Sequence, residues 1–222
     1  MPRKHSHKRQ AQPQPAGKST RRQSPQLAAQ RQQLAYAAAR IMVDEHISAF
    51  EHARRKAAER MGISNRRLWP DNEEIQQRLL EQQRLFGRES HQREWRELLQ
   101  QALNAMRLFD AFSPRLVGPA LAGTATRAQG IELQVFAEST EEVIWTLIDR
   151  QIPWSPDQAQ FRYAGNQRLD HPIVRFVAGA VPIQVDVLPP NARRNPPLDP
   201  VSNRPQRGAS HSEVETLLDE IP

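Results

Sequence analysis

The chain has 222 residues, of which 38% are hydrophobic, 18 are prolines and 9 are glycines. A chain of this length has room for one ordinary domain or two small ones, and the low hydrophobic content indicates sizeable segments outside any core. It contains no cysteine, which excludes disulfides and thiolate metal sites. We find no apolar stretch of secretory length and none near the roughly 18 residues that a membrane span requires, so we expect a cytoplasmic protein that does not enter a membrane.

The net charge of +6 is unevenly distributed along the chain. The first 43 residues contain nine basic residues and no acid, so the remainder holds 22 basic and 25 acidic residues, a net charge of −3. Residues 1–24 are rich in Gln, Pro, Ser, Lys and Arg. Such a segment buries too little surface to offset its chain entropy, and we expect a disordered basic arm. The arm acts either as a solubilising tail or as a weak, sequence-independent contact for nucleic acid or ribosomes.

Residues 25–112 carry a helical pattern, with apolar residues that recur at spacings of three and four. The pattern predicts four helices that pack on one another. The expected helices are one around Leu34–Met42, one from about Ser48 to Met61, one that begins at Asp71 with Glu74 as its capping partner, and one from about Glu89 to Phe109.

Residues 113–190 carry the pattern of a small α/β domain. We expect strands at 116–121, 131–136, 161–163, 173–177 and 181–188, and one helix after Ser139, which forms a capping box with Glu142. The last two strands are joined by a connection short enough for a hairpin. This order predicts a mixed sheet covered on one side, and with the preceding helices it makes the fold class α+β.

Residues 191–222 are again rich in Pro and Arg as far as Arg207. We expect a disordered tail there, followed by a short amphipathic helix over about 212–221 whose apolar face docks on the body of the protein or on a partner.

The segment from Leu116 to Thr124, followed by the strand Gly130-Ile131-Glu132-Leu133-Gln134-Val135-Phe136, resembles the core of the nucleotidyltransferase (DNA polymerase β-like) superfamily. That family has a strand that ends in Gly-Ser, a strand with two aspartates separated by one residue, and a third acid on a later strand. Gly123-Thr124 stands in the position of Gly-Ser, and Asp186 stands in the position of the third acid. The resemblance covers about Phe109 to Pro190, under half of the chain.

The resemblance implies Mg²⁺ as cofactor, a nucleoside triphosphate as substrate and nucleotidyl transfer to an acceptor. Acids at positions i and i+2 of a strand share one face, so both can reach the same ion, and Mg²⁺ prefers oxygen ligands. In this sequence the pair is either Gly130 with Glu132 or Glu132 with Gln134, and one carboxylate is missing in both cases. The resemblance thus implies Glu132 and Asp186 as the catalytic and metal-binding residues, in a chain that is either active or a catalytically impaired relative.

The same resemblance implies that Gly123 and Thr124 approach the phosphates of the nucleotide. Other interpretations of the two acids remain open. Alternation alone places a polar residue at Glu132, and Asp186 lies among apolar residues, where it needs an ion or a partner such as Arg175. The alternative functions are a non-enzymatic nucleic-acid- or ribosome-associated module that uses the basic arm, and a protein-interaction scaffold.

Overall fold

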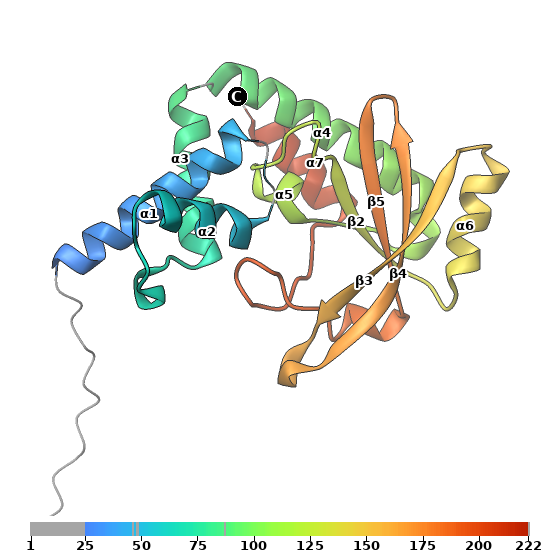
Figure 1. Ribbon diagram of the computed structural model, residues 1–222. Helices are drawn as coiled ribbons and strands as arrows, with labels where there is room; N and C mark the ends of the chain where they lie inside the picture. The colour runs from blue at the N-terminus through green and yellow to red at the C-terminus, as the bar shows by residue number, and fades with distance from the viewer. Residues whose placement is uncertain (1–24, 46, 48, 87, 222) are drawn as a thin grey trace, which may run out of the picture.

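The computed structural model describes residues 25–221 except 46, 48 and 87, so the basic arm expected at 1–24 lies outside the described residues. Helices and a sheet follow one another along the chain, which confirms the α+β class (Figure 1). The helical part consists of α1 (Pro25–Asp44), α2 (Phe50–Arg60), the short 3-10 helix η1 (Arg66–Leu68), α3 (Asn72–Phe86), α4 (Arg88–Leu108) and η2 (Asp110–Phe112). The part with the sheet consists of β1 (Arg115–Val117), α5 (Gly118–Ala122), β2 (Ile131–Phe136), α6 (Thr140–Asp149), β3 (Trp154–Arg162), η3 (Ala164–Asn166), β4 (Arg168–Ala178), β5 (Val181–Leu188), η4 (Pro190–Arg193) and α7 (His211–Glu220).

The first three helices share a hydrophobic core of their own. Leu34 and Ile41 on α1 and Ile75 on α3 are fully or almost fully buried. On α2 the buried positions are alanines, Ala53 and Ala57, and their small side chains let this helix pack closely against its neighbours.

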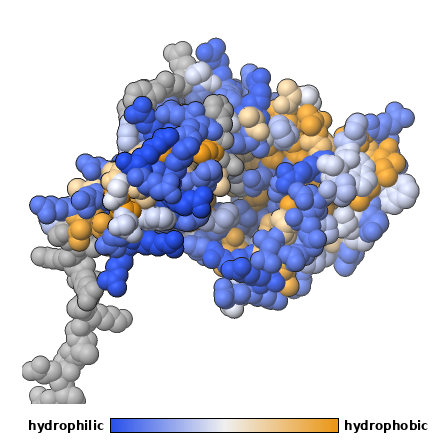
Figure 2. Space-filling model, in the orientation of Figure 1, coloured by the Kyte–Doolittle hydropathy of each residue, from blue (hydrophilic) through white to orange (hydrophobic). Residues whose placement is uncertain are grey.

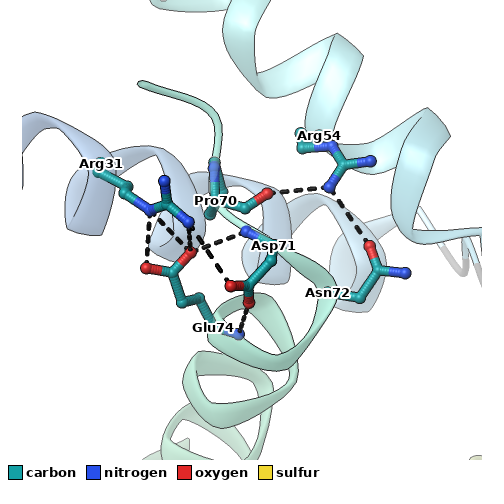
Figure 3. A network of polar contacts seen from close by, with 6 residues as sticks. All are labelled: Arg31, Arg54, Pro70, Asp71, Asn72 and Glu74. Carbon is teal, nitrogen blue, oxygen red and sulfur yellow. Dashed lines mark hydrogen bonds and ion pairs between the residues drawn. The ribbon is translucent and has the colours of Figure 1, made fainter. Parts of the chain in front are cut away.

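The start of α3 is held by side chains from two other helices (Figure 3). The Asp71 carboxylate accepts from the Glu74 amide at 2.9 Å, and the Glu74 carboxylate accepts from the Asp71 amide at 2.7 Å, which confirms the predicted capping box. Arg31 of α1 donates through Nε to both Glu74 oxygens at 2.7 and 2.8 Å. Arg54 of α2 donates to the carbonyl oxygen of Pro70 at 2.9 Å. The carboxylate of Glu74 therefore caps α3 and joins α3 to α1.

Helix α4 packs differently from the sequence expectation. Its buried residues Leu98, Leu103 and Met106 belong to the core of the sheet and not to the cluster formed by α1–α3. The same core includes Val143 of α6 and Val214 of α7. The sequence periodicity identified the apolar face of α4 correctly, but it could not say which element that face covers.

The sheet has the strand order β1-β2-β5-β4-β3, and β2 and β5 run parallel while the other neighbours are antiparallel. The β4–β5 hairpin is confirmed, and β3 and β4 are longer than expected. The predicted strand 116–121 is wrong after Val117, because Gly118 turns the chain with a φ of 69° and Pro119 starts α5. The capping box predicted at Ser139 is also wrong, since the Ser139 side chain makes no capping hydrogen bond.

The two faces of the sheet differ in polarity. Leu133, Val185 and Val174 occupy paired positions on neighbouring strands and face the core beneath α4, α6 and α7. Their alternate neighbours, described below, place polar side chains on the opposite face.

The segment after β5 is ordered, so the expected disorder of the C-terminal tail is wrong for residues 191–221. The Leu198 amide donates to the Arg162 carbonyl at the end of β3 at 2.6 Å, and Leu116 and Ala209 exchange two backbone hydrogen bonds of 2.8 Å. The terminal helix α7 forms as predicted and buries Val214 fully, so it docks in cis. Proline and arginine content indicated a loop correctly, but a loop without regular structure can still be fixed by backbone pairing to a sheet.

The surface view agrees with this arrangement. Figure 2 shows a largely hydrophilic surface over α1–α3 and more hydrophobic surface on the side of the sheet and α6. Trp145 and Ile148 of α6 are exposed. Among residues 25–221 with their gaps, no helix combines the length and apolar character needed to cross a bilayer.

Candidate functional site

Polar side chains form two adjacent rows across the face of the sheet opposite α4 and α6. Directly paired residues on neighbouring strands share a face, so the strand register defines the rows. One row, from β1 to β4, is Arg115, Gln134, Asp186 and Ile173; the other is Val117, Glu132, Gln184 and Arg175. The structure therefore places Glu132 and Asp186, the two acids predicted from the sequence, on the same face of neighbouring parallel strands.

Glu132 and Asp186 are diagonal neighbours, because Glu132 pairs with Gln184 and Asp186 pairs with Gln134. Their carboxyl groups are close enough for the negative charge of Glu132 to raise the pKa of Asp186. An ion or a cationic group placed between them would relieve that repulsion.

Asp186 is the more deeply buried of the two acids, with only 3% of its surface exposed. Burial raises the pKa of its carboxyl to about 7, and the hydrogen bond from Gln184 Nε2, at 2.9 Å, opposes that rise. Arg175, the partner suggested by the sequence, instead forms an ion pair with Asp157 at 2.9 Å. Asp186 Oδ1 therefore accepts from an amide and not from an arginine, and a pKa of about 7 makes the carboxyl partly neutral at neutral pH.

Glu132 is half-buried beside a glycine, which argues against an ordinary solvent-facing strand residue. A Cβ atom added to Gly118 would lie 2.4 Å from Glu132 Oε2, so the carboxylate rests directly on the turn between β1 and α5. Burial raises the pKa of Glu132, the positive charge of Arg175 lowers it, and the negative charge of Asp199 raises it. Gly118 is a site residue that the sequence interpretation missed, although the Gly-Pro pair after an apolar strand indicated a turn there.

Gly130 and Gln134, the two residues that flank Glu132 in the alternative registers, have different surroundings. Gly130 precedes β2 with a φ of 78°, and a Cβ atom there would lie 2.1 Å from the Pro182 carbonyl oxygen, so this glycine allows a close approach of two backbones. Gln134 lies on the polar face of β2 together with Glu132. Gln134 is fully buried, and its Nε2 donates to Gln206 Oε1 at 2.9 Å. Its Oε1 has no hydrogen-bond partner within the described part of the chain.

Gly123 and Thr124 lie at the far end of α5 and contact a different part of the protein. The Thr124 amide and hydroxyl both donate to the Pro119 carbonyl oxygen, at 2.9 and 3.4 Å. The carbonyl oxygen of Gly123 lies 2.9 Å from His91 Nε2, on α4. A Cβ atom added to Gly123 would lie 3.3 Å from the Trp95 ring. These contacts are those of a helix end packed on α4, and the hydroxyl expected to meet a phosphate bonds to the backbone.

A buried Tyr–His pair lies near Asp186 and was not identified from the sequence. Tyr163 Oη and His171 Nε2 are 2.8 Å apart, and both side chains are buried. Burial raises the pKa of Tyr163, and the charge of Asp186 raises it further. Tyr163 directly follows β3 and His171 lies within β4, and nothing in their sequence spacing indicated that they would meet.

The polar face supplies an incomplete donor set for metal ions. In the ranges that the structure describes, no group of three or more His, Cys, Asp and Glu side chains could hold a metal ion. Glu132 and Asp186 offer two carboxylates, and Mg²⁺ often takes one or two carboxylates and fills its remaining positions with phosphate oxygens and water. Two carboxylates would leave most positions of such an ion to ligands from outside the chain.

The chain matches no protein-family model, no curated protein and no solved structure. The likeness to nucleotidyltransferases consequently stays a prediction from the sequence, and a function has to be argued from the residues on this face.

Proposed function

We propose that this chain is a nucleotidyltransferase-like protein that binds a nucleoside triphosphate beside Glu132 and Asp186 and has lost efficient nucleotidyl transfer. The observation that supports the proposal is the position of these two acids, which share one face of neighbouring parallel strands with Gln134 between Arg115 and Asp186.

The donor set argues for binding with impaired transfer. A bound Mg²⁺ would neutralise charge on the phosphates, and Glu132 and Asp186 would hold it. In the register that pairs Glu132 with Gln134, Gln134 offers at most a neutral oxygen, and its amide already bonds to Gln206. Loss of one carboxylate reduces the negative charge that holds the ion, so we expect weak metal binding in the absence of nucleotide and a much reduced rate of transfer.

Protonation adds a pH dependence to this proposal. The pKa of Asp186 is about 7, so at pH 6 most of the molecules carry a neutral carboxyl that does not bind Mg²⁺. Nucleotide binding that depends on Mg²⁺ should therefore strengthen as the pH rises from 6 to 8.

Isothermal titration calorimetry with each of the four nucleoside triphosphates tests the proposal. The wild type should release or absorb heat in Mg²⁺, and Asp186→Asn should bind about tenfold more weakly, because it removes one charged ligand while its amide oxygen can still accept from Gln184. Asp149→Asn, at an exposed position at the end of α6, is the matched control and should leave binding unchanged. Absence of heat from the wild type with all four nucleotides, or equal binding by wild type and Asp186→Asn, would refute the proposal.

A further inference from the structure

A cavity of about 950 Å³ opens at the carboxyl ends of the parallel strands β2 and β5. Its wall includes Phe136, the last residue of β2, and residues of η4, which follows β5. Gly118 and Glu132 lie toward the other end of β2, since Val117 pairs with Glu132 while Arg115, which lines the cavity, pairs with Gln134. The cavity is therefore distinct from the turn on which Glu132 rests. Ligands of open α/β sheets often bind beyond the carboxyl ends of the strands.

Positive charge dominates the wall of this cavity. The lining residues include four arginines, Arg115, Arg193, Arg194 and Arg207, and one acid, Glu213. Four positive charges and one negative charge leave a net of +3.

The single acid is already engaged by other groups. Glu213 Oε2 accepts from the Ser210 amide at 2.6 Å and from the Ser210 hydroxyl at 2.5 Å, and it lies 3.3 Å from Arg115 Nη1. The hydrogen bonds from Ser210 lower the pKa of Glu213, so it is ionised at neutral pH. Within the described residues, Arg193, Arg194 and Arg207 form no ion pair, which leaves three guanidinium groups without a compensating charge.

Backbone contacts fix the two segments that carry the arginines. The η4 turn is closed by hydrogen bonds from the Ala192 amide to the Pro189 carbonyl at 2.9 Å and from the Arg194 amide to the Asn191 carbonyl at 3.1 Å. Next to Arg207, Gly208 has a φ of 64°, and a Cβ atom there would lie 2.8 Å from the Leu116 carbonyl oxygen. The backbone beside Arg207 therefore packs closely on β1.

We propose that this cavity binds a small molecule that carries two or more linked phosphate groups. The planar guanidinium group pairs with phosphate oxygens in a bidentate manner, and three uncompensated arginines from two separate segments match a chain of phosphates better than a single one. The volume lies in the range of small-molecule sites. Phe136, Pro190 and Pro196 add an apolar wall for the rest of the ligand. This proposal does not depend on the nucleotidyltransferase-like function, because the arginines bind phosphate without Mg²⁺.

Calorimetry with inorganic tripolyphosphate in EDTA tests the site in the full-length chain. The wild type should bind tripolyphosphate, and it should bind orthophosphate more weakly. Arg193→Gln/Arg194→Gln should reduce tripolyphosphate affinity by about tenfold or more, since two charged contacts are lost. Arg207→Gln, which changes a lining arginine outside η4, should give a loss of the same kind.

Arg66→Gln/Arg67→Gln is the matched control, because it also removes tandem arginines from a short 3-10 helix, η1. The basic residues at 1–24 are present in every variant, so any contribution from them is the same throughout. The control should stay within about twofold of the wild type, as expected for surface charges remote from the cavity. Equal losses in the two double variants, or no binding by the wild type at low salt, would overturn the site.

A nucleoside triphosphate in EDTA forms a further arm of the experiment. Affinity equal to that of tripolyphosphate means that the phosphates alone are recognised, and higher affinity means that the apolar wall also contacts the nucleoside; both results support the site. A cavity that fails to bind these phosphates in EDTA is distinguishable from a failure of the proposed function. The proposed function is tested by nucleotide binding in Mg²⁺, which Asp186→Asn should weaken.

Discussion

The side-chain amide of Gln134 donates a hydrogen bond of 2.9 Å to the side-chain oxygen of Gln206, 72 residues later in the chain. Gln134 belongs to the polar face of β2, and Gln206 belongs to the segment that returns across that face from the end of β3, where Leu198 is bonded to Arg162. The bond thus connects the acid-bearing face to the C-terminal segment. Because an amide is neutral, it is buried beside Asp186 at a lower cost than a second carboxylate would be.

The first prediction concerns the charge at this position. Gln134→Glu places a carboxylate directly opposite Asp186 on the neighbouring strand, in a fully buried site. We expect a loss of about 3 kcal/mol in the free energy of unfolding at pH 8 in EDTA, because two like charges are then buried together. Urea denaturation in EDTA and in Mg²⁺ measures this loss of stability. Mg²⁺ should restore part of the stability by bridging the two acids.

Gln134→Leu is the control for the loss of the amide itself. It removes a buried oxygen that has no partner, and with it the hydrogen bond to Gln206, so we expect a loss of about 1 kcal/mol, smaller than that of the Glu variant. If the Glu and Leu variants were equally stable in EDTA, the electrostatic interpretation of this position would be wrong.

The second prediction concerns pH. Folding raises the pKa of Asp186 from 3.8 to about 7, so between these values the folded state binds more protons than the unfolded state. Stability should therefore be greatest below the unfolded pKa of this residue, fall as the pH rises from about 4 to about 7, and level off above that, with a contribution of a few kcal/mol. Asp186→Asn should remove that contribution.

Urea denaturation at pH 5 and pH 8 measures this difference in each protein. The wild type should lose more stability than Asp186→Asn between the two pH values. Asp149→Asn, which changes an exposed acid, should follow the wild type. If the wild type and Asp186→Asn showed the same pH dependence of stability, Asp186 would be ionised in the folded protein at both pH values.

The sequence predicted most of the secondary structure because its signals are local. The capping box at Asp71 and Glu74 depends on residues three positions apart, and the β4–β5 hairpin depends on a short connection. The assignment of α4 to the sheet core depends on contacts between distant segments, which a 3.6-residue period does not contain. The folded C-terminal segment was missed for the same reason, since it is held by pairing to Leu116 and Arg162.

In the candidate site, too, the arrangement of the residues depends on contacts between segments that are distant in the sequence. Glu132 and Asp186 were chosen by resemblance to the motif of another family, and the parallel pairing of β2 and β5 places them on one face of the sheet. Gly123 and Thr124 were also chosen by likeness to this motif, but β1 ends four residues before the end of the predicted strand 116–121, and Gly118 is the glycine that contacts Glu132. The arginines of the cavity lie in a segment read as disordered, and no sequence pattern joined them to Arg115.

The third prediction concerns the close approach at Gly130. In Gly130→Ala the new Cβ would lie 2.1 Å from the backbone oxygen of Pro182, at a φ of 78°. Backbone on both sides must move, so we expect a loss of roughly 3 kcal/mol or more in the free energy of unfolding.

Gly165→Ala is the matched control, because Gly165 has a similar φ of 73° and no atom within 4 Å of the added Cβ. It should lose only about 1–2 kcal/mol, the cost of a left-handed conformation for alanine. Urea denaturation of both variants measures the difference. If both variants lost the same free energy of unfolding, the contact with Pro182 would not contribute to the loss. The left-handed φ alone would then explain the effect.

The last prediction concerns the basic arm, which contains seven Lys and Arg residues between positions 1 and 24 and no acid. If this segment contacts nucleic acid, replacing all seven with Gln should abolish retention on single-stranded RNA at low salt, because release of counterions from phosphates supplies the affinity. The slope of log K against log salt concentration should become less negative by up to about 5, since each phosphate contact on a single strand contributes roughly 0.7. A shuffled arm of the same composition is the control, and it should bind as the wild type does, because counterion release does not depend on the order of the residues. Retention that survives the Gln replacements would assign RNA contact to the folded body, whereas loss in the shuffled arm would mean that the order of residues is read.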